Sequence, residues 1–480
     1  MKDRIFARRN FLMKTGQSLL AIPALSLLPR IGVAEEAQPL QAGKKSTTTP
    51  GSKTIVTKPK IILNVRDFGA TGDGATKDTA AIQQTIDRCS VFGGGEARVP
   101  SGNYLTGSIQ LKSNVVLRFE EGATLTGSSD YADYPVTQVR WEGKWIEGHV
   151  GLIYAIDAEH IGVAGPGKIA GYSPANIPFN MQMKLRRPTL IEPIHCNDIH
   201  LEGFSTSYRG MWSLHPTCCE NVVIRNLTIR STGGLGDGID IDSCKHVRIE
   251  GCDIATGDDC ISLKSGRGSE GYLLHKPTED VHISNCTFAD SIFACIGIGS
   301  ETSGGIRGVR IEHCKFTGAK TFALYIKSRP GRGAFIEDIV ANDLEVSGTQ
   351  GGLIRFNLLA SGKQDEEPVP GREGIPTVRN FRFTNIRVTD APILVDGTSV
   401  HPDKPLEGFS LVNVTGSCTK GIYLANVRNA VIRNVNVTGL GGPLININNV
   451  TGIGLHGAAT IDAPKVGEPV AIPAQPYQLH

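Results

Sequence analysis

Apolar and polar positions alternate along most of the chain, in short runs that are interrupted every few residues. One motif recurs about every 21–30 residues: a polar residue, alternating apolar positions, a bend at Asn or Gly, and a further apolar position. Clear copies begin at Asn197 and Asn221, and the last begins at Asn429. Alternation predicts strands with one buried face, and Asn tolerates a left-handed backbone at a bend. A fixed period of this size predicts a solenoid of stacked coils.

We therefore expect an all-β fold: a single-stranded parallel β-helix of roughly ten coils over residues 60–460. The leucine-rich-repeat signature and the longer blades of a propeller do not match this sequence. The frequent bends predict no long strand and no helix within the coils. One helix is predicted before them, over Thr79–Cys89, with Asp78 as its N-cap and with Ile82 and Ile86 on its apolar face. Its expected role is to cover the open apolar end of the solenoid.

The first 34 residues are interpreted as an export signal. The pair Arg8-Arg9 is followed by Phe-Leu, by an apolar run over 18–28, and by small residues at 32–34. This order is similar to a bacterial twin-arginine signal, with an ordinary secretory signal or an uncleaved anchor as alternatives. The apolar run is short for a membrane span. We expect a flexible linker over 35–59, a tail over 461–480, and an exported monomer that is periplasmic or extracellular, with no membrane partner.

Charge and cysteine content bear on three further features: nucleic-acid binding, zinc sites and disulfides. The formal net charge is +2, and the excess of basic residues lies in the export segment, so the composition does not favour a nucleic-acid partner. The eleven cysteines lie mostly in apolar, strand-like contexts, and no zinc-type C-x-x-C pair occurs. We interpret them mainly as small buried apolar residues at stacked positions. One or two disulfides stay open as an alternative.

The chemistry that stands out is carried by Asp237 and the pair Asp258-Asp259, which lie about one repeat apart. Residues one repeat apart stack on the same face, so we expect the three carboxylates on one wall. Such a group can supply the acid and the water-activating base that break a glycosidic bond. The alternative is that Asp serves bend geometry alone, which is our interpretation of Asp240 and Asp242 as turn-capping or amide-binding residues. Longer insertions near 130–150, 173–190, 266–279 and 357–378 are expected to border a cleft.

Several motifs extend this pattern into a family resemblance. Gly236–Asp240 (GDGID) resembles Asn-Thr-Asp-Gly-Ile-Asp, Gly257–Cys260 (GDDC) contains Gly-Asp-Asp, and Gly299–Gly305 (GSETSGG) resembles Gly-Ser-Glu-Met-Ser-Gly-Gly. Tyr325–Lys327 lies where Arg-Ile-Lys is expected, with Trp212–Pro216 upstream. In this order and spacing, over about 60–440, the chain is similar to family 28 of the glycoside hydrolases, the polygalacturonase family.

The resemblance implies a right-handed β-helix and hydrolysis of α-linked galacturonide bonds with inversion. Carried over, Asp258 would be the general acid, while Asp237 and Asp259 would hold and deprotonate the attacking water. Substrate binding would fall to Lys327 together with the further candidates Tyr325, Arg329, Arg332 and Lys264. Arg355 is expected either in the cleft or in a structural pair. No cofactor and no metal are implied.

Departures from the family pattern shape the expected function. The family His should fall near Phe293–Cys295, where this chain has none, and the Arg of Arg-Ile-Lys is Tyr325. These losses indicate a divergent subgroup that cuts a different pectic linkage, such as rhamnogalacturonan or a modified oligogalacturonide. We expect a glycosidase acting on pectic polysaccharides or oligosaccharides, with exo cleavage because insertions would close one end of the cleft. The alternatives are a calcium-dependent eliminase similar to pectate lyase and a non-catalytic glycan-binding β-helix.

Overall fold

A computed structural model describes residues 61–171 and 185–471. The chain divides into two units, Met1–Val56 and Thr57–His480. The predicted export signal and linker, and most of the insertion predicted near 173–190, lie outside the described residues. Within the described ranges, no helix has both the length and the apolar character that crossing a membrane requires.

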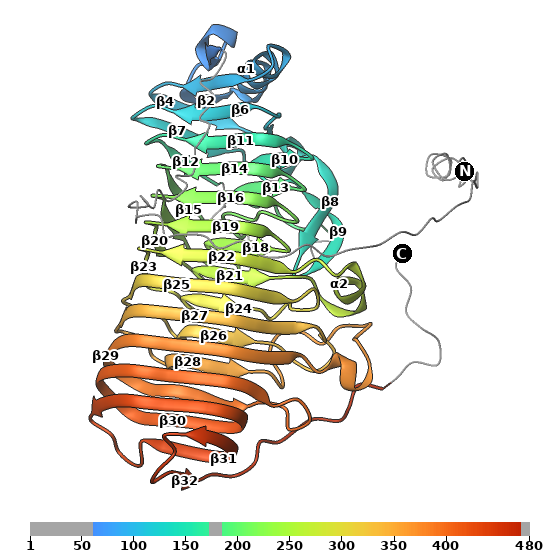
Figure 1. Cartoon of the computed structure of the whole chain (residues 1–480). Coiled ribbons are helices and arrows are strands. Elements are labelled where there is room, and N and C mark those ends of the chain that lie inside the picture. Colours follow the sequence, from blue (N-terminus) through green and yellow to red (C-terminus); the bar gives the residue numbers. More distant parts are fainter. Residues whose placement is uncertain (1–60, 172–184, 472–480) are drawn as a thin grey trace, which may run out of the picture. The chain divides into compact units, whose positions relative to one another are not determined.

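The Thr57–His480 unit is a stack of parallel coils, each built from strands on three faces (Figure 1). On the first face lie β1 (Ile62–Asn64), β3 (Gly95–Val99), β6 (Val115–Phe119), β11 (Glu159–Ala164), β14 (Asn197–Glu202), β16 (Glu220–Arg225), β19 (Lys245–Glu250) and β22 (Thr278–Ser284). On the second face lie β2 (Asp73–Lys77), β4 (Gly102–Thr106), β7 (Ala123–Gly127), β12 (Lys168–Ala170), β15 (Ser205–Tyr208), β17 (Thr228–Ser231), β20 (Asp253–Ala255) and β23 (Thr287–Ala289).

The third face carries the candidate site. It consists of β5 (Ile109–Gln110), β10 (Ile153–Ile156), β13 (Ile191–Ile194), β18 (Ile239–Asp242), β21 (Ile261–Lys264), β24 (Ile296–Ile298), β26 (Phe322–Lys327) and β28 (Gly352–Asn357). Its strands alternate strictly: Ile239, Ile261 and Ile296 point into the core and are 0% exposed. The residue after each of them points away from the core, and Asp240, Ser262 and Gly297 form a row along successive coils that is itself buried.

The later coils contain longer strands than the sequence predicts. They are β25 (Ile306–Phe316), β27 (Phe335–Val346), β29 (Thr377–Ser399), β30 (Leu406–Thr438) and β31 (Ile445–Ile453), followed by β32 (Ala459–Thr460). The expectation of no long strand is therefore wrong. A single residue with positive φ, such as Asn413 (58°) or Asn434 (53°), turns the chain within β30. Hydrogen bonds to the neighbouring coil continue on both sides of such a bend.

The core is a set of apolar rows that run along the stack. Val222, Val247, Val281 and Val309 occupy equivalent register positions in four successive coils and are at most 1% exposed. All eleven cysteines belong to the described ranges; ten are buried, one is partly exposed, and none forms a disulfide. Cys196, Cys219 and Cys244 stack in three consecutive coils, where each backbone N–H of the first two donates to the next sulfur at 3.4 Å. The prediction of stacked, buried thiols is confirmed.

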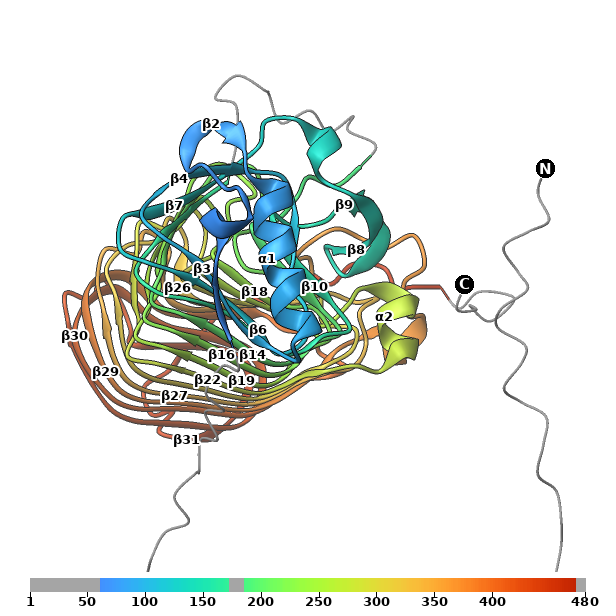
Figure 2. The same cartoon turned by 90° about the horizontal axis from the view of Figure 1, so that it is seen from above.

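Helix α1 (Thr79–Val91) lies across the first coils (Figure 2), and Ile82 and Ile86 are fully buried against them. Asp78 occupies the predicted N-cap position, but its side chain does not cap the helix, because its carboxylate accepts hydrogen bonds from the Thr71 and Gly72 amides at 2.7 and 3.0 Å. The turn before the helix uses these oxygens instead. The remaining short elements are α2 (Gly268–Leu274), which the sequence does not predict, the hairpin β8 (Val136–Trp141) and β9 (Lys144–His149), and the 3-10 turns η1 (Val65–Phe68), η2 (Tyr131–Asp133) and η3 (Gly371–Gly374).

Candidate active site

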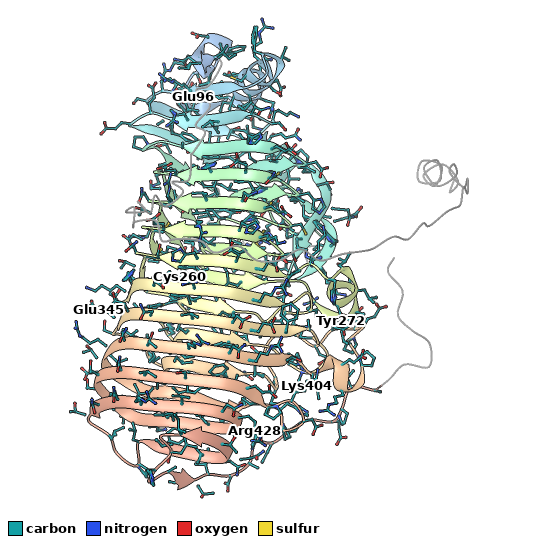
Figure 3. The ribbon with its side chains drawn as sticks, viewed as in Figure 1. Glu96, Cys260, Tyr272, Glu345, Lys404 and Arg428 are labelled. Carbon is teal, nitrogen blue, oxygen red and sulfur yellow. The ribbon has the colours of Figure 1, made fainter. Side chains whose placement is uncertain are left out.

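Three carboxylates meet on the third face because the register of neighbouring coils aligns them. Asp237 and Asp259 each lie two residues before a strand, β18 and β21, and these strands pair with Ile239 opposite Ile261. The Gly238 amide donates to the Asp259 carbonyl at 3.0 Å, so the alignment continues ahead of the strands. Oxygens of Asp237, Asp258 and Asp259 lie within 4.8 Å of one another. In Figure 3 the label at Cys260, the next residue, locates this level of the stack.

The three carboxylates differ in access to solvent. Asp237 and Asp259 are 4% and 2% exposed, whereas Asp258 is partly exposed. Burial, followed by the charge of Asp259, raises the pKa of Asp258 to about 6. Burial and the charges of Asp240 and Asp258 raise the pKa of Asp237 well above its usual range. Crowded acids in a poorly solvated place hold their protons, which is the condition for a general acid near neutral pH.

Two lysines balance the acidic cluster. Lys327 Nζ lies 2.5 Å from Asp259 Oδ2, and Lys264 Nζ lies 3.4 Å from Glu301 Oε2 and 3.5 Å from Asp240 Oδ1. Burial opposes the charge of Lys327, but Asp259 outweighs it and raises the pKa of Lys327. Burial likewise opposes the charge of Glu301, yet Lys264 and Arg332 lower the pKa of Glu301 to about 2.

Asp240 and Asp242 differ from their interpretation as turn-capping or amide-binding residues. Burial raises the pKa of Asp240 to about 8, against the opposing charge of Lys264. Asp242 accepts a hydrogen bond from Arg140 Nε at 3.3 Å and another from Ser243 Oγ at 2.9 Å. Asp240 and Asp242 both point outward from β18. Asp240 therefore pairs with Lys264, and Asp242 with Arg140.

Gly297 makes room for the central ion pair. It stands between Ser262 and Tyr325 in the outward row of the third face. A Cβ at this position would lie 2.5 Å from Asp259 Oδ2 and 2.9 Å from Lys327 Nζ. Any side chain here would displace Asp259, Lys327 or both, so the absence of a side chain at Gly297 is a requirement of the site.

An aromatic stack lies beside the carboxylates. The rings of Phe293 and Tyr325 are 5.5 Å apart with an interplanar angle of 19°. Lys327 Nζ lies 4.9 Å from the Phe293 centroid, and the Arg355 guanidinium carbon lies 5.4 Å from the Tyr325 centroid. Arg355 also pairs with Asp396 at 3.5 Å. The sequence motifs do not predict Phe293 as a site residue; the missing family His in that segment is the signal that points to it.

The other predicted binding residues contact the protein itself. Arg332 is 1% exposed and donates to the carbonyl oxygens of Ser300 and Lys363 at 3.0 and 2.7 Å. Arg329 is partly exposed and donates to the Gly362 carbonyl at 2.7 Å. Both guanidinium groups therefore hold the segment after β28 in place. Lys264 is 6% exposed and lies over the Trp212 ring at 4.8 Å.

Three of the predicted insertions join into one wall beside the third face. Arg140 of the β8–β9 hairpin pairs with Asp242 and with Glu270 of α2, at 3.3 and 3.0 Å. Arg267 pairs with Asp365, from the segment after β28, at 3.1 Å. Further pairs cross the same wall: Lys363–Glu142 at 2.8 Å, Lys144–Asp365 at 3.4 Å and Arg267–Glu142 at 3.3 Å. Figure 3 labels Tyr272 of α2 on this side of the stack.

The carboxylate cluster has the composition of a cation site as well as that of an acid–base site. Oxygens within 4.8 Å of one another can share a calcium ion with ligand distances of about 2.3–2.6 Å. The Lys327 ammonium already neutralises Asp259, however, and competes with any metal ion for that carboxylate. The arrangement therefore favours proton transfer between carboxylates and a bound water.

Fold and site together define a class: a glycosidase built on a right-handed parallel β-helix. A family model described as "Glycosyl hydrolases family 28" matches residues 89–391. The chain is 30% identical to a probable polygalacturonase of Vitis vinifera, over 73% of this chain and 73% of that protein. It is 27% identical to an exo-poly-alpha-D-galacturonosidase of Dickeya chrysanthemi, over 74% of this chain and 67% of that protein.

A solved structure gives the same answer. The hyperthermoactive exopolygalacturonase of Thermotoga maritima superposes with a TM-score of 0.68 at 27% identity, covering 78% of this chain and 92% of that one. The family match extends over more than half of the chain. The protein belongs to glycosyl hydrolase family 28, and the resemblance drawn from its motifs is confirmed.

Proposed function

We propose that the protein hydrolyses α-linked galacturonide-type bonds in pectic polysaccharides or oligosaccharides, by a single displacement that uses the three clustered carboxylates. The observation that carries this proposal is the convergence of Asp237, Asp258 and Asp259 within 4.8 Å, one of them partly exposed and two of them buried. Family membership supports the reaction class. The relatives named above supply the substrate class, since two of them are exo-acting on galacturonan by name.

Asp258 acts as the general acid. It is the cluster member that reaches the open side of the site, and its pKa of about 6 leaves it a proton to give in weakly acidic solution. Protonating the leaving oxygen avoids the release of an alkoxide, a role worth about 10²–10⁴-fold in rate. The amide of Asp259 donates to Asp258 Oδ1 at 2.9 Å and fixes the carboxyl group's orientation.

Asp237 and Asp259 hold the attacking water. A water can form hydrogen bonds with two carboxyl oxygens about 5 Å apart, because each bond spans about 2.8 Å. Asp259, paired with Lys327, takes the proton from this water, while Asp237 orients it from the preceding coil. The oxygens lie closer together than the carboxyl separation of about 6.5–9.5 Å that is usual for inverting enzymes. The anomer formed first, observed by proton NMR, therefore tests inversion directly.

The side chains around the carboxylates bind substrate. Lys327 and Tyr325 lie on β26 beside Asp259 and are the residues we assign to the bond being cut; Lys264 supports them through Glu301 and Asp240. The wall formed by the β8–β9 hairpin, α2 and the segment after β28 limits the site on one side, which supports exo cleavage. We further propose that the protein is exported and acts as a monomer without a cofactor.

The deciding experiment measures products from pectic polymers and oligomers with the mature protein and its Asp258→Asn variant. We expect release of short saturated products, and a loss of about 10²–10⁴-fold in the variant. Asp253→Asn is the matched control: it lies on β20 of the same coil, is exposed, and pairs with Arg230 at the surface. Its activity should equal that of the wild type.

The alternative functions give different results in the same assay. An unsaturated product that absorbs in the ultraviolet, formed only with calcium and abolished by a chelator, would identify an eliminase. Glycan binding without any product, unchanged by Asp258→Asn, would identify a non-catalytic binder. Either result would overturn the proposed hydrolysis.

A further inference from the structure

Two aromatic residues give the site an apolar surface next to the catalytic carboxylates. Phe293 is partly exposed and lies on Tyr325, which is 6% exposed, so Phe293 offers a ring face and Tyr325 supports it. The loop that carries Phe293 is fixed to the acid: Ser291 Oγ donates to the Asp258 carbonyl at 2.9 Å and accepts from the Phe293 amide at 3.1 Å. Ile292, in the same loop, is 47% exposed. The ring is therefore held at a fixed place relative to Asp258.

The cations that adjoin this surface are already matched by acids. Among the residues the structure describes, the cationic groups over the two rings are those of Lys327 and Arg355. Lys327 pairs with Asp259 at 2.5 Å, and Arg355 pairs with Asp396 at 3.5 Å. A ligand carboxylate placed on the rings would therefore meet several acids and no unmatched cation among these groups. Like charges in a poorly solvated site repel strongly.

A sugar ring without a free carboxylate is not repelled by the neighbouring acids and needs no unmatched cation to bind. Its C–H face can pack on the Phe293 ring, and aromatic faces gain binding energy from such apolar contact. An ester methyl group would add apolar area beside the rings and Ile292. The same surface thus disfavours an ionised uronate and favours an uncharged unit of similar shape.

We propose that the surface formed by Phe293 and Tyr325 selects a pectic unit whose carboxylate is esterified, so that the protein acts on methyl-esterified galacturonides in preference to the free acids. This inference rests on the proposed function, because it concerns the substrate of the same site. It assigns Phe293 and Tyr325 a role in specificity, and it assigns none in proton transfer.

The test compares kcat/KM for two oligogalacturonides of equal length, one de-esterified and one fully methyl-esterified. The wild type should prefer the ester by about tenfold or more, which corresponds to about 1.4 kcal/mol. The double variant Phe293→His/Tyr325→Arg replaces the phenyl and phenol rings by an imidazole and a guanidinium group, the residue types of the family pattern; its preference should shift toward the free acid by about tenfold or more. Tyr325→Phe keeps the stack and should keep the preference. Phe92→His, at an exposed ring after α1, is the matched control and should change nothing.

The outcomes separate this inference from the proposed function. Cleavage of neither oligomer by the wild type would end the proposed function and the inference with it. Cleavage with a preference for the free acid, or an ester preference that the double variant leaves unchanged, would overturn the inference alone. If the double variant does not fold, calorimetry with the inactive Asp258→Asn protein decides: tighter binding of the ester supports the inference, and tighter binding of the free acid overturns it.

Discussion

Two rows of polar side chains run along this stack, and they illustrate opposite uses of the same geometry. At the bends of the later coils, asparagines form a ladder in which Asn434 donates to Asn413 and Asn413 donates to Asn385, at 3.0 and 2.9 Å. On the third face, Asp237 and Asp259 occupy equally adjacent positions in neighbouring coils. The ladder is exposed and uncharged, whereas the carboxylates are buried and crowded.

The difference follows from the donors and acceptors of each group. A side-chain amide carries both, so identical residues in successive coils satisfy one another. An ionised carboxylate carries acceptors alone, so stacked carboxylates need a bound proton or a cation. The site uses both: raised pKa values at Asp237 and Asp258, and ammonium groups at Lys327 and Lys264. The asparagine ladder stabilises the fold, whereas the row of carboxylates keeps a carboxyl group protonated for the reaction.

The largest expected effect comes from removing a cation from the buried row. Lys327→Met should leave Asp259 buried without its partner and lower the free energy of unfolding by about 3–5 kcal/mol. Activity should also be lost, because the water-binding carboxylate changes its charge state. Denaturant unfolding and turnover measure both. The control is Lys315→Met, whose pair with Glu345 at 3.9 Å is more than half exposed on both sides and should be worth less than about 1 kcal/mol. Equal destabilisation of the two variants would show that the buried Lys327–Asp259 pair contributes no more to stability than the exposed Lys315–Glu345 pair.

A second way to break the acidic row is to fill the space that it needs. Gly297→Ala would place a methyl group 2.5 Å from Asp259 Oδ2. Moving a catalytic group by about 1 Å can reduce kcat by about 10²-fold. We expect a loss of that size, measured with saturating substrate. Gly442→Ala, at a glycine with open space around its Cβ position and no left-handed backbone, should retain full activity. Wild-type turnover in Gly297→Ala would show that Asp259 and Lys327 tolerate displacement.

Part of this site is predictable from the repeat alone. The spacing of apolar anchors determines which residues stack, and that spacing is sufficient to place Asp237 next to Asp259. The bends at Asn are also predictable, although their compatibility with continuous strands such as β30 is not. That continuity depends on hydrogen bonds between coils, which a single-coil pattern does not describe.

The remaining features depend on contacts between distant segments. The motifs predict Lys327 as a substrate-binding residue, but its pairing with Asp259 depends on the missing side chain of Gly297 in the intervening coil. Arg332 is covered by the segment after β28, whose position follows from ion pairs with α2 and the β8–β9 hairpin. A linear period carries no information on how insertions fold onto one another.

The proton held by the acidic row also gives a pH dependence that the amide ladder cannot produce. Asp258 must be protonated to act as the general acid, and its pKa is about 6. Activity is therefore retained below this value and lost as pH rises through it, with kcat/KM falling about tenfold per pH unit on the alkaline side. The profile should be recorded together with circular dichroism, so that unfolding is distinguished from titration. A flat profile from about pH 5 to 8 would exclude Asp258 as the acid with this pKa.

The smallest expected effect on activity lies in the amide ladder. Asn413→Ala removes a side chain that donates to Asn385 and accepts from Asn434, and it places alanine at a φ of 58°. Each hydrogen bond is worth about 0.5–1.5 kcal/mol, and the left-handed conformation costs a non-glycine residue about 1–2 kcal/mol. Asn413→Gly also loses the hydrogen bonds but avoids the cost of the left-handed conformation. The difference in thermal unfolding between the two variants therefore measures that cost. Both should retain full activity, because the ladder lies on β29 and β30, whereas the carboxylates lie just before β18 and β21. A ladder variant that lost activity without losing stability would show that the two rows are coupled through the coils.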